Sequence, residues 1–116
     1  MRSSIVRDWL PVLVWAVVIF AFSAVPDLGT GLGGWDLVLR KLAHIAEYAL
    51  LGALLVRATG RSGLAFGLAV LYAASDEWHQ TFVEGRVGAV HDVAIDAVGA
   101  AVGIVLYRSL RARRFA

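Results

Sequence analysis

Cysteine is absent from the chain, and charged residues make up only 17% of its 116 residues. Without cysteine there is no disulfide, thiolate nucleophile or zinc–cysteine site, although this absence says nothing about the compartment. A hydrophobic share of 59% and a mean hydropathy of +0.73 exclude an ordinary soluble domain of this length, whose apolar share is about half. The composition therefore favours a membrane protein.

Proline is also scarce, with two in the whole chain. Pro11 is expected in the first turn of a helix, where its missing N–H costs little, and Pro26 opens a glycine-rich loop. The apolar runs between such breaks are long enough to cross a bilayer as helices. We therefore predict an all-α, four-helix transmembrane bundle in one domain over residues 1–116, with helices at about 9–25, 37–56, 63–80 and 90–108.

Arginine accounts for most of the basic residues and gives a formal net charge of +2. A nucleic-acid partner is not expected, because the arginines flank apolar runs and have no interleaved aromatic platform. The positive-inside rule compares the basic residues on the two sides of the membrane. Eight arginines lie at one set of helix ends, and Arg40, Lys41 and Arg86 lie at the other. The rule predicts an integral plasma-membrane protein with both termini in the cytoplasm. The eight are Arg2, Arg7, Arg57, Arg61, Arg108, Arg111, Arg113 and Arg114.

Polar residues of three helices converge at the predicted outer end of this bundle. On the second helix they share a face about 120° wide, and on the third they line one side of its last turn. A lone charged side chain at the bilayer centre costs about 2.5–3.5 kcal/mol, so these groups should pair with one another. The residues of the two faces are Lys41, His44, Glu47, Tyr48, Asp76, His79 and Gln80.

The fourth helix adds Asp92, Asp96, Gly99 and Gly103, which fall within a stripe about 60° wide. The glycines match the small-xxx-small pattern by which membrane helices approach closely. Asp96 lies about 6 Å deeper along the helix axis than Asp92, so it should face the bundle interior and meet a donor. The candidate donors are Lys41, His44 and Tyr48.

The order and spacing of these residues form three motifs. They are Lys41-x-x-His44-x-x-x-Tyr48-x-x-x-Gly52, Asp76-Glu77-x-x-Gln80-x-Phe82, and Gly85-Arg86 followed by Asp92, Asp96, Gly99 and Gly103. From about residue 20 to residue 103 the chain resembles the VanZ-like membrane proteins. It departs from their pattern at Glu84, where the family often has Pro, and at Asp96, where it often has Asn.

The resemblance implies a four-helix membrane protein of the cell envelope. The family is named for a protein associated with low-level resistance to teicoplanin, a glycopeptide that binds peptidoglycan precursors outside the cell. Glycopeptide resistance is therefore the phenotype that the resemblance implies. It names no reaction, so whether this chain is an enzyme stays open.

We interpret the outer cluster as a pocket that binds or modifies a lipid-linked or peptidoglycan-related anion. Lysine, arginine and tyrosine donate to phosphate or carboxylate, and histidine moves a proton near neutral pH. The catalytic candidates are His44, Asp76 and Asp92. The substrate-binding candidates are Lys41, Tyr48, Gln80, Arg86 and Asp96, and the supporting residues are Glu47, Glu77 and His79.

Alternative interpretations of the same cluster stay open. Asp76, Glu77 and His79 with an aspartate of the fourth helix suit a divalent metal, but no fixed ligand motif is present, so no metal or other cofactor is predicted. A small transporter or proton relay, or a scaffold held by a structural ion-pair network, would use the same residues. The expected partners are membrane lipids and a lipid-linked or cell-wall precursor, and the oligomeric state is left open.

Overall fold

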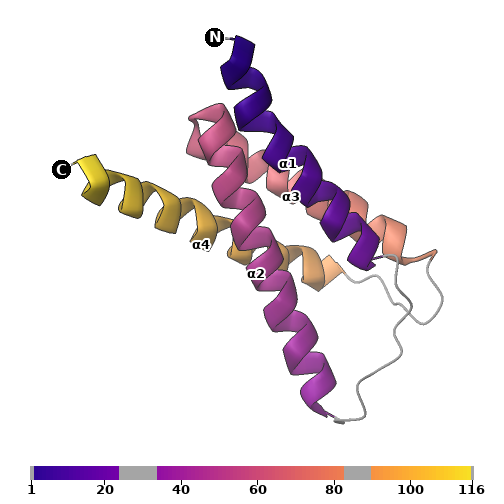
Figure 1. The fold of residues 1–116 in the computed structure, drawn as a ribbon. Coiled ribbons are helices and arrows are strands. Elements are labelled where there is room, and N and C mark those ends of the chain that lie inside the picture. Colours follow the sequence, from indigo (N-terminus) through magenta and orange to yellow (C-terminus); the bar gives the residue numbers. More distant parts are fainter. Residues whose placement is uncertain (1, 24–33, 83–89, 116) are drawn as a thin grey trace.

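Four helices and no strand make up residues 2–23, 34–82 and 90–115, which are the part of the chain that the computed structural model describes (Figure 1). The prediction of an all-α bundle is confirmed, and each predicted helix is present. The helices are α1 (Arg2–Ser23), α2 (Gly34–Thr59), α3 (Ser62–Gln80) and α4 (Val90–Phe115).

The helices extend beyond the apolar runs from which they were predicted. α4 continues to Phe115 through a basic tail, because arginine is a good helix former and does not break the hydrogen-bond ladder. α2 ends at a tight turn in which Gly60 has a φ of 71°, a value that favours glycine. This turn reverses the chain, so α3 runs back along α2.

Pro11 lies inside α1 and not in its first turn, so that expectation was wrong. The reason is that α1 already begins at Arg2, in the polar segment that precedes the apolar run. Proline has no N–H, so the carbonyl of Arg7, four residues earlier, loses its helical partner. The guanidinium of Arg57 in α2 donates to that carbonyl at 3.3 Å. The proline thereby leaves a carbonyl available, and the hydrogen bond to this carbonyl connects α1 with α2.

Three helices are long and apolar enough to cross a membrane, over Ile5–Phe22 in α1, Lys41–Thr59 in α2 and Asp92–Ala112 in α4. α3 has 19 residues and is not among them. Its last turns carry Asp76, Glu77 and His79, which lower its hydropathy. These helices fit a membrane protein, and α3 packs against α2 and α4 within the bundle.

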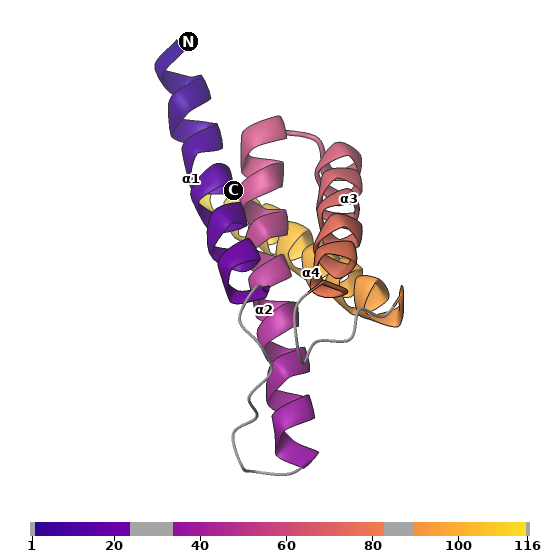
Figure 2. The same cartoon turned by 90° about the vertical axis from the view of Figure 1, so that its right-hand side faces the viewer.

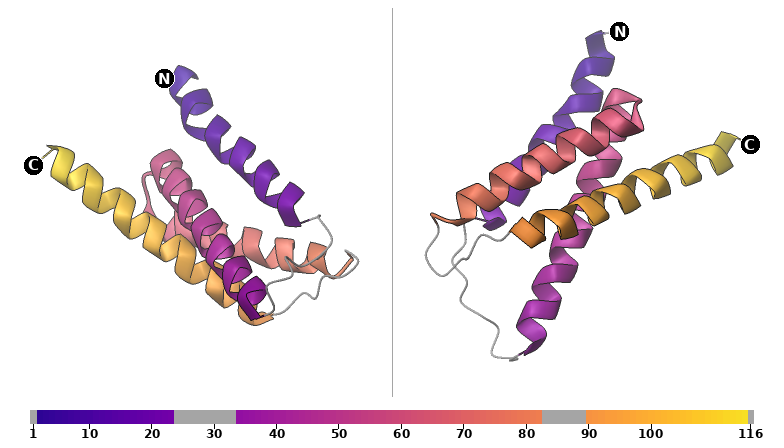
Figure 3. Two further views of the ribbon diagram at one scale, coloured as in Figure 1. Left: turned by 60° about the horizontal axis from the view of Figure 1, so that its bottom comes forward. Right: turned by 180° about the vertical axis from the view of Figure 1, so that it is seen from behind.

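The most extensive helix contact joins α2 and α4, which run in the same direction and cross near their middles (Figures 1 and 3). Gly99 permits this crossing, because a Cβ at that position would lie 2.6 Å from the carbonyl oxygen of Ile45. At Gly103 a Cβ would collide with the backbone of Ala49. The predicted packing role of the two glycines is confirmed.

α1 lies on the outside of the unit formed by α2, α3 and α4 (Figures 2 and 3). Hydrogen bonds on its inner flank join it to its neighbours: Trp15 Nε1 of α1 donates to the carbonyl of Glu47 in α2 at 2.9 Å, and the Tyr72 hydroxyl of α3 donates to the carbonyl of Ala16 in α1. Its other flank exposes large apolar side chains, as expected of a helix that faces lipid.

Candidate functional site

Two pairs of side chains connect α2 with α4 at the end of the bundle where both helices begin. Lys41 forms an ion pair with Asp92, and the Nδ1 atom of His44 lies 3.0 Å from Oδ1 of Asp96. An ionised carboxylate only accepts, so Nδ1 of His44 is the donor in the second pair. Because the two helices run in the same direction, spacings of three on α2 and four on α4 keep both pairs in register.

A third pair adds α3 to this arrangement. The Tyr48 hydroxyl donates to Oδ2 of Asp76 at 3.2 Å, and both side chains are buried. Tyr48 lies four residues beyond His44, on the same face of α2, and the two rings are nearly parallel with centroids 6.4 Å apart. α2 therefore carries the donors, while α3 and α4 carry the acceptors. We call these six residues the polar ladder: Lys41, His44, Tyr48, Asp76, Asp92 and Asp96.

Exposure decreases along the polar ladder from its first pair to its last. The Lys41 and Asp92 side chains are 28% and 18% exposed, whereas those of His44 and Asp96 are 14% and 1% exposed. Tyr48, one turn further along α2, is fully buried. The ladder thus opens to the surroundings beside Lys41 and closes toward the middle of the bundle.

Asp96 was predicted to face the interior and to meet a donor, and that donor is His44. Its second oxygen, Oδ2, is buried and has no hydrogen-bond partner within the described residues. A buried acceptor without a donor costs about 1–3 kcal/mol, so such an atom calls for an explanation.

His79 takes a different place from the other candidates of α3. Its ring stacks on Phe20 of α1, with centroids 4.0 Å apart, so it faces α1 and not the carboxylates of α4. Glu77 is buried next to Asp76. Glu47 contributes its backbone carbonyl, which accepts the hydrogen bond of Trp15, and its side chain is half-buried.

Tyr72 is a residue that sequence reasoning missed. Its ring lies 6.2 Å from that of Tyr48, and its hydroxyl bonds to α1. Tyr72 precedes Asp76 by four residues and so shares its face of α3. A tyrosine hydroxyl in an apolar run needs a partner, and that signal would have placed Tyr72 beside the ladder.

Two candidates fall wholly or partly outside the described residues. Arg86 belongs to residues 83–89, and for Gln80 only the helical backbone of α3 is described. The metal hypothesis gains no support from α2, α3 and α4 as described, because no group of three or more His, Asp or Glu is placed to hold an ion.

The helices and the site together define a class: a helical membrane protein with a buried, paired polar cluster where three helices meet, which makes the cluster a candidate functional site. The chain belongs to the VanZ/LLP1 family, whose model matches residues 5–111. Teicoplanin resistance is the known association of this family. No curated protein and no solved structure matches the chain. Family membership confirms the resemblance seen in the motifs.

Proposed function

We propose that the polar ladder is a binding site for a lipid-linked or peptidoglycan-related anion of the cell envelope. The observation that carries this proposal is the buried Oδ2 atom of Asp96, which has no hydrogen-bond partner within the described residues. Sugar hydroxyls and peptide amides are donors that envelope precursors offer to such an atom. Lys41 supplies the charge for the anionic group, since it is partly exposed beside Asp92.

The proposal also assigns the ladder to the outer side of the plasma membrane, with both termini in the cytoplasm. Its support is the distribution of arginines under the positive-inside rule. Because the chain has no cysteine, single introduced thiols report the topology without background. A membrane-impermeant maleimide should label Thr81→Cys in intact cells, and Gly63→Cys only after lysis. The reverse pattern would refute the assignment. Both positions are exposed.

If the site also modifies its ligand, His44, Asp76 and Asp92 are the groups that exchange protons with it. His44 is the foremost of the three, because imidazole gains and loses a proton near neutral pH. Lys41 and Arg86 then stabilise developing negative charge on the ligand. Tyr48 and Gln80 complete the binding groups as hydrogen-bond donors.

A binding experiment tests the proposal directly. The purified full chain is titrated with a polyprenyl diphosphate in detergent, and the bound lipid is counted by native mass spectrometry. His44→Ala and Asp76→Asn should weaken binding by about tenfold, as expected for the loss of about 1.4 kcal/mol of polar contact. Arg61→Gln, exposed in the turn between α2 and α3, is the matched control and should bind this ligand like the unaltered protein. Equal binding by all variants would refute the site.

A susceptibility assay connects the site with the family's known association. Cells that produce the unaltered chain should tolerate more teicoplanin than cells that produce His44→Ala at the same membrane level. If both tolerate the drug equally while the unaltered chain protects, the ladder is not the site responsible.

A non-catalytic scaffold is the second candidate function, and the ion pair between Lys41 and Asp92 favours it. In that case the ladder serves only to hold α2 and α4 together, and charge balance matters more than the identity of each residue. The proton-relay alternative has less support, because the buried residues that follow Tyr48 along α2 are all non-polar: Leu51, Gly52, Leu55 and Val56.

A further inference from the structure

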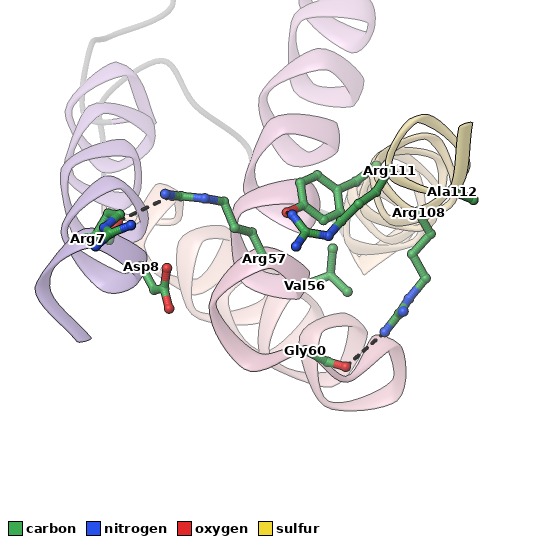
Figure 4. Close-up of a pocket in the computed structure, with 9 residues that line it drawn as sticks. Arg7, Asp8, Val56, Arg57, Gly60, Arg108, Arg111 and Ala112 are labelled. Atoms are coloured by element: carbon green, nitrogen blue, oxygen red, sulfur yellow. Dashed lines mark hydrogen bonds between the residues drawn. The ribbon is translucent and has the colours of Figure 1, made fainter. Parts of the chain in front are cut away.

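A second polar site lies at the end of the bundle opposite the polar ladder. It is a pocket of about 690 Å³ between α1, α2 and α4, lined by Arg7, Asp8, Arg57, Tyr107, Arg108 and Arg111 among others (Figure 4). A smaller hollow of about 360 Å³ shares Arg57, Tyr107 and Arg111 with it and is also lined by Leu110. We call the two together the basic pocket.

The charge of the basic pocket is unbalanced. Among the described residues that line it are four guanidinium groups and one carboxylate, which gives these residues a formal excess of three positive charges (4 − 1). Like charges held this close repel one another, whereas a bound anion relieves the repulsion. The excess favours an anionic occupant.

Two of these guanidinium groups are held in place by hydrogen bonds to backbone carbonyls. Arg57 donates to the carbonyl of Arg7 at 3.3 Å, and Arg108 donates to the carbonyl of Gly60 at 3.0 Å (Figure 4). Arg108 also donates to the hydroxyl of Ser62. A guanidinium has five N–H groups, so these bonds orient the side chains and use only part of their donors. Preoriented arginines suit phosphate, which they bind through two parallel hydrogen bonds.

The depth of the basic pocket matches that of a lipid headgroup. The first candidate span begins at Ile5, the second ends at Thr59 and the third ends at Ala112, so all three span ends meet at this pocket. Tyr107 is an aromatic residue of the kind enriched at membrane interfaces. Leu110 is 63% exposed beside the arginines, which offers an apolar surface to an acyl chain.

We propose that the basic pocket binds the phosphate of an anionic membrane lipid, with the headgroup among Arg7, Arg57 and Arg111 and an acyl chain along Leu110. Pockets of this kind between membrane helices bind anionic headgroups. The site holds α1, α2 and α4 together from outside the chain, because its arginines come from all three helices. It is separate from the polar ladder and does not depend on the function proposed for it.

Native mass spectrometry of the full chain in detergent tests this proposal with three probes: phosphatidylglycerol, phosphatidylcholine and inorganic phosphate. Phosphatidylglycerol should remain bound preferentially over phosphatidylcholine. Each of Arg57→Gln and Arg111→Gln should reduce its retention about fivefold, since an arginine near anionic lipid contributes about 1 kcal/mol. Asp8→Asn should increase retention, because it removes a carboxylate from the lining of the pocket.

Arg61→Gln is the matched control, since Arg61 is exposed in the turn between α2 and α3 and does not line the pocket. It should bind phosphatidylglycerol like the unaltered chain. Equal retention of the two lipids, or an equal loss in Arg61→Gln, would overturn the proposal. Displacement of the lipid by millimolar inorganic phosphate would also overturn it, in favour of a soluble anion. Arg111→Gln keeps the test valid if Arg57→Gln fails to fold.

Discussion

The charged side chains at the two ends of α2 have different kinds of partners. At its start, Lys41 and His44 meet carboxylates of α4 within the same chain. At its end, Arg57 joins three other arginines around a pocket whose described lining includes one carboxylate, that of Asp8. At the first end the basic groups pair with carboxylates of the same chain, whereas the described lining of the second end has an excess of positive charge. Internal pairing suits a shaped site that recognises one ligand, whereas an unbalanced pocket suits an abundant anion.

A substitution where α2 and α4 cross, between these two ends, should have the largest effect on the protein. Gly103→Leu places a side chain where the backbone of Ala49 lies, and overpacking of this kind costs about 1–3 kcal/mol or more. We expect early unfolding in a detergent–SDS titration and loss of both sites. Gly67→Leu is the control, because nothing lies within 4 Å of a Cβ built there. Equal stability of the two variants would show that α2 and α4 do not cross this closely.

Loss of an acceptor in the polar ladder should have the next largest effect. Asp96→Ala leaves the donor of His44 buried without its partner, at a cost of about 1–3 kcal/mol in the free energy of unfolding. Asp96→Asn keeps an acceptor oxygen and should cost less. A double-mutant cycle with His44→Ala measures the coupling. Additive losses would mean that the two side chains do not interact.

Removal of one hydroxyl should give a smaller effect that differs between the two ends. Tyr48→Phe deletes the hydrogen bond to Asp76 and should cost about 1 kcal/mol. Tyr107→Phe removes a hydroxyl that accepts from the exposed Arg111, and it should change stability little. If Tyr48→Phe and Tyr107→Phe lose equal stability in the same SDS titration, the two hydroxyls do not differ in burial as described.

A charge exchange between Lys41 and Asp92 should have the smallest effect on stability. It also distinguishes a binding site from a scaffold. Partly exposed ion pairs contribute about 0.2–1 kcal/mol, so Lys41→Asp and Asp92→Lys together should restore most of the stability that either change removes. A scaffold should then recover its phenotype. A binding site should stay impaired, because the lysine no longer stands where the anion docks.

Much of the fold could be predicted from hydropathy and helical spacing. The two glycines of α4 gave the close contact with α2, and the depth of Asp96 gave its need for an interior donor. Helical spacing fixes which residues share a face, but not how that face is rotated toward its neighbours. For that reason His79 was grouped with Asp76, although it stacks on Phe20 of α1.

The basic pocket shows a second limit of the sequence. Its arginines were interpreted only as topology signals, because their positions along the chain do not reveal that Arg7, Arg57 and Arg111 line one cavity. Whether these arginines meet depends on the tilt of α4 and on where α1 begins. The predicted helix began at about residue 9, whereas α1 begins at Arg2. The misplaced start also hid the free carbonyl that Pro11 creates.

The separation along the chain between the ladder's donors and acceptors has a consequence for biosynthesis. Tyr48 precedes Asp76 by 28 residues, and Lys41 and His44 precede their partners on α4 by 51 and 52. During translation Lys41 and His44 are therefore made before the carboxylates of α4 with which they pair. Nascent chains arrested before Val90 should be recognised by membrane quality control, whereas release of α4 completes the neutralisation and protects the product from proteolysis.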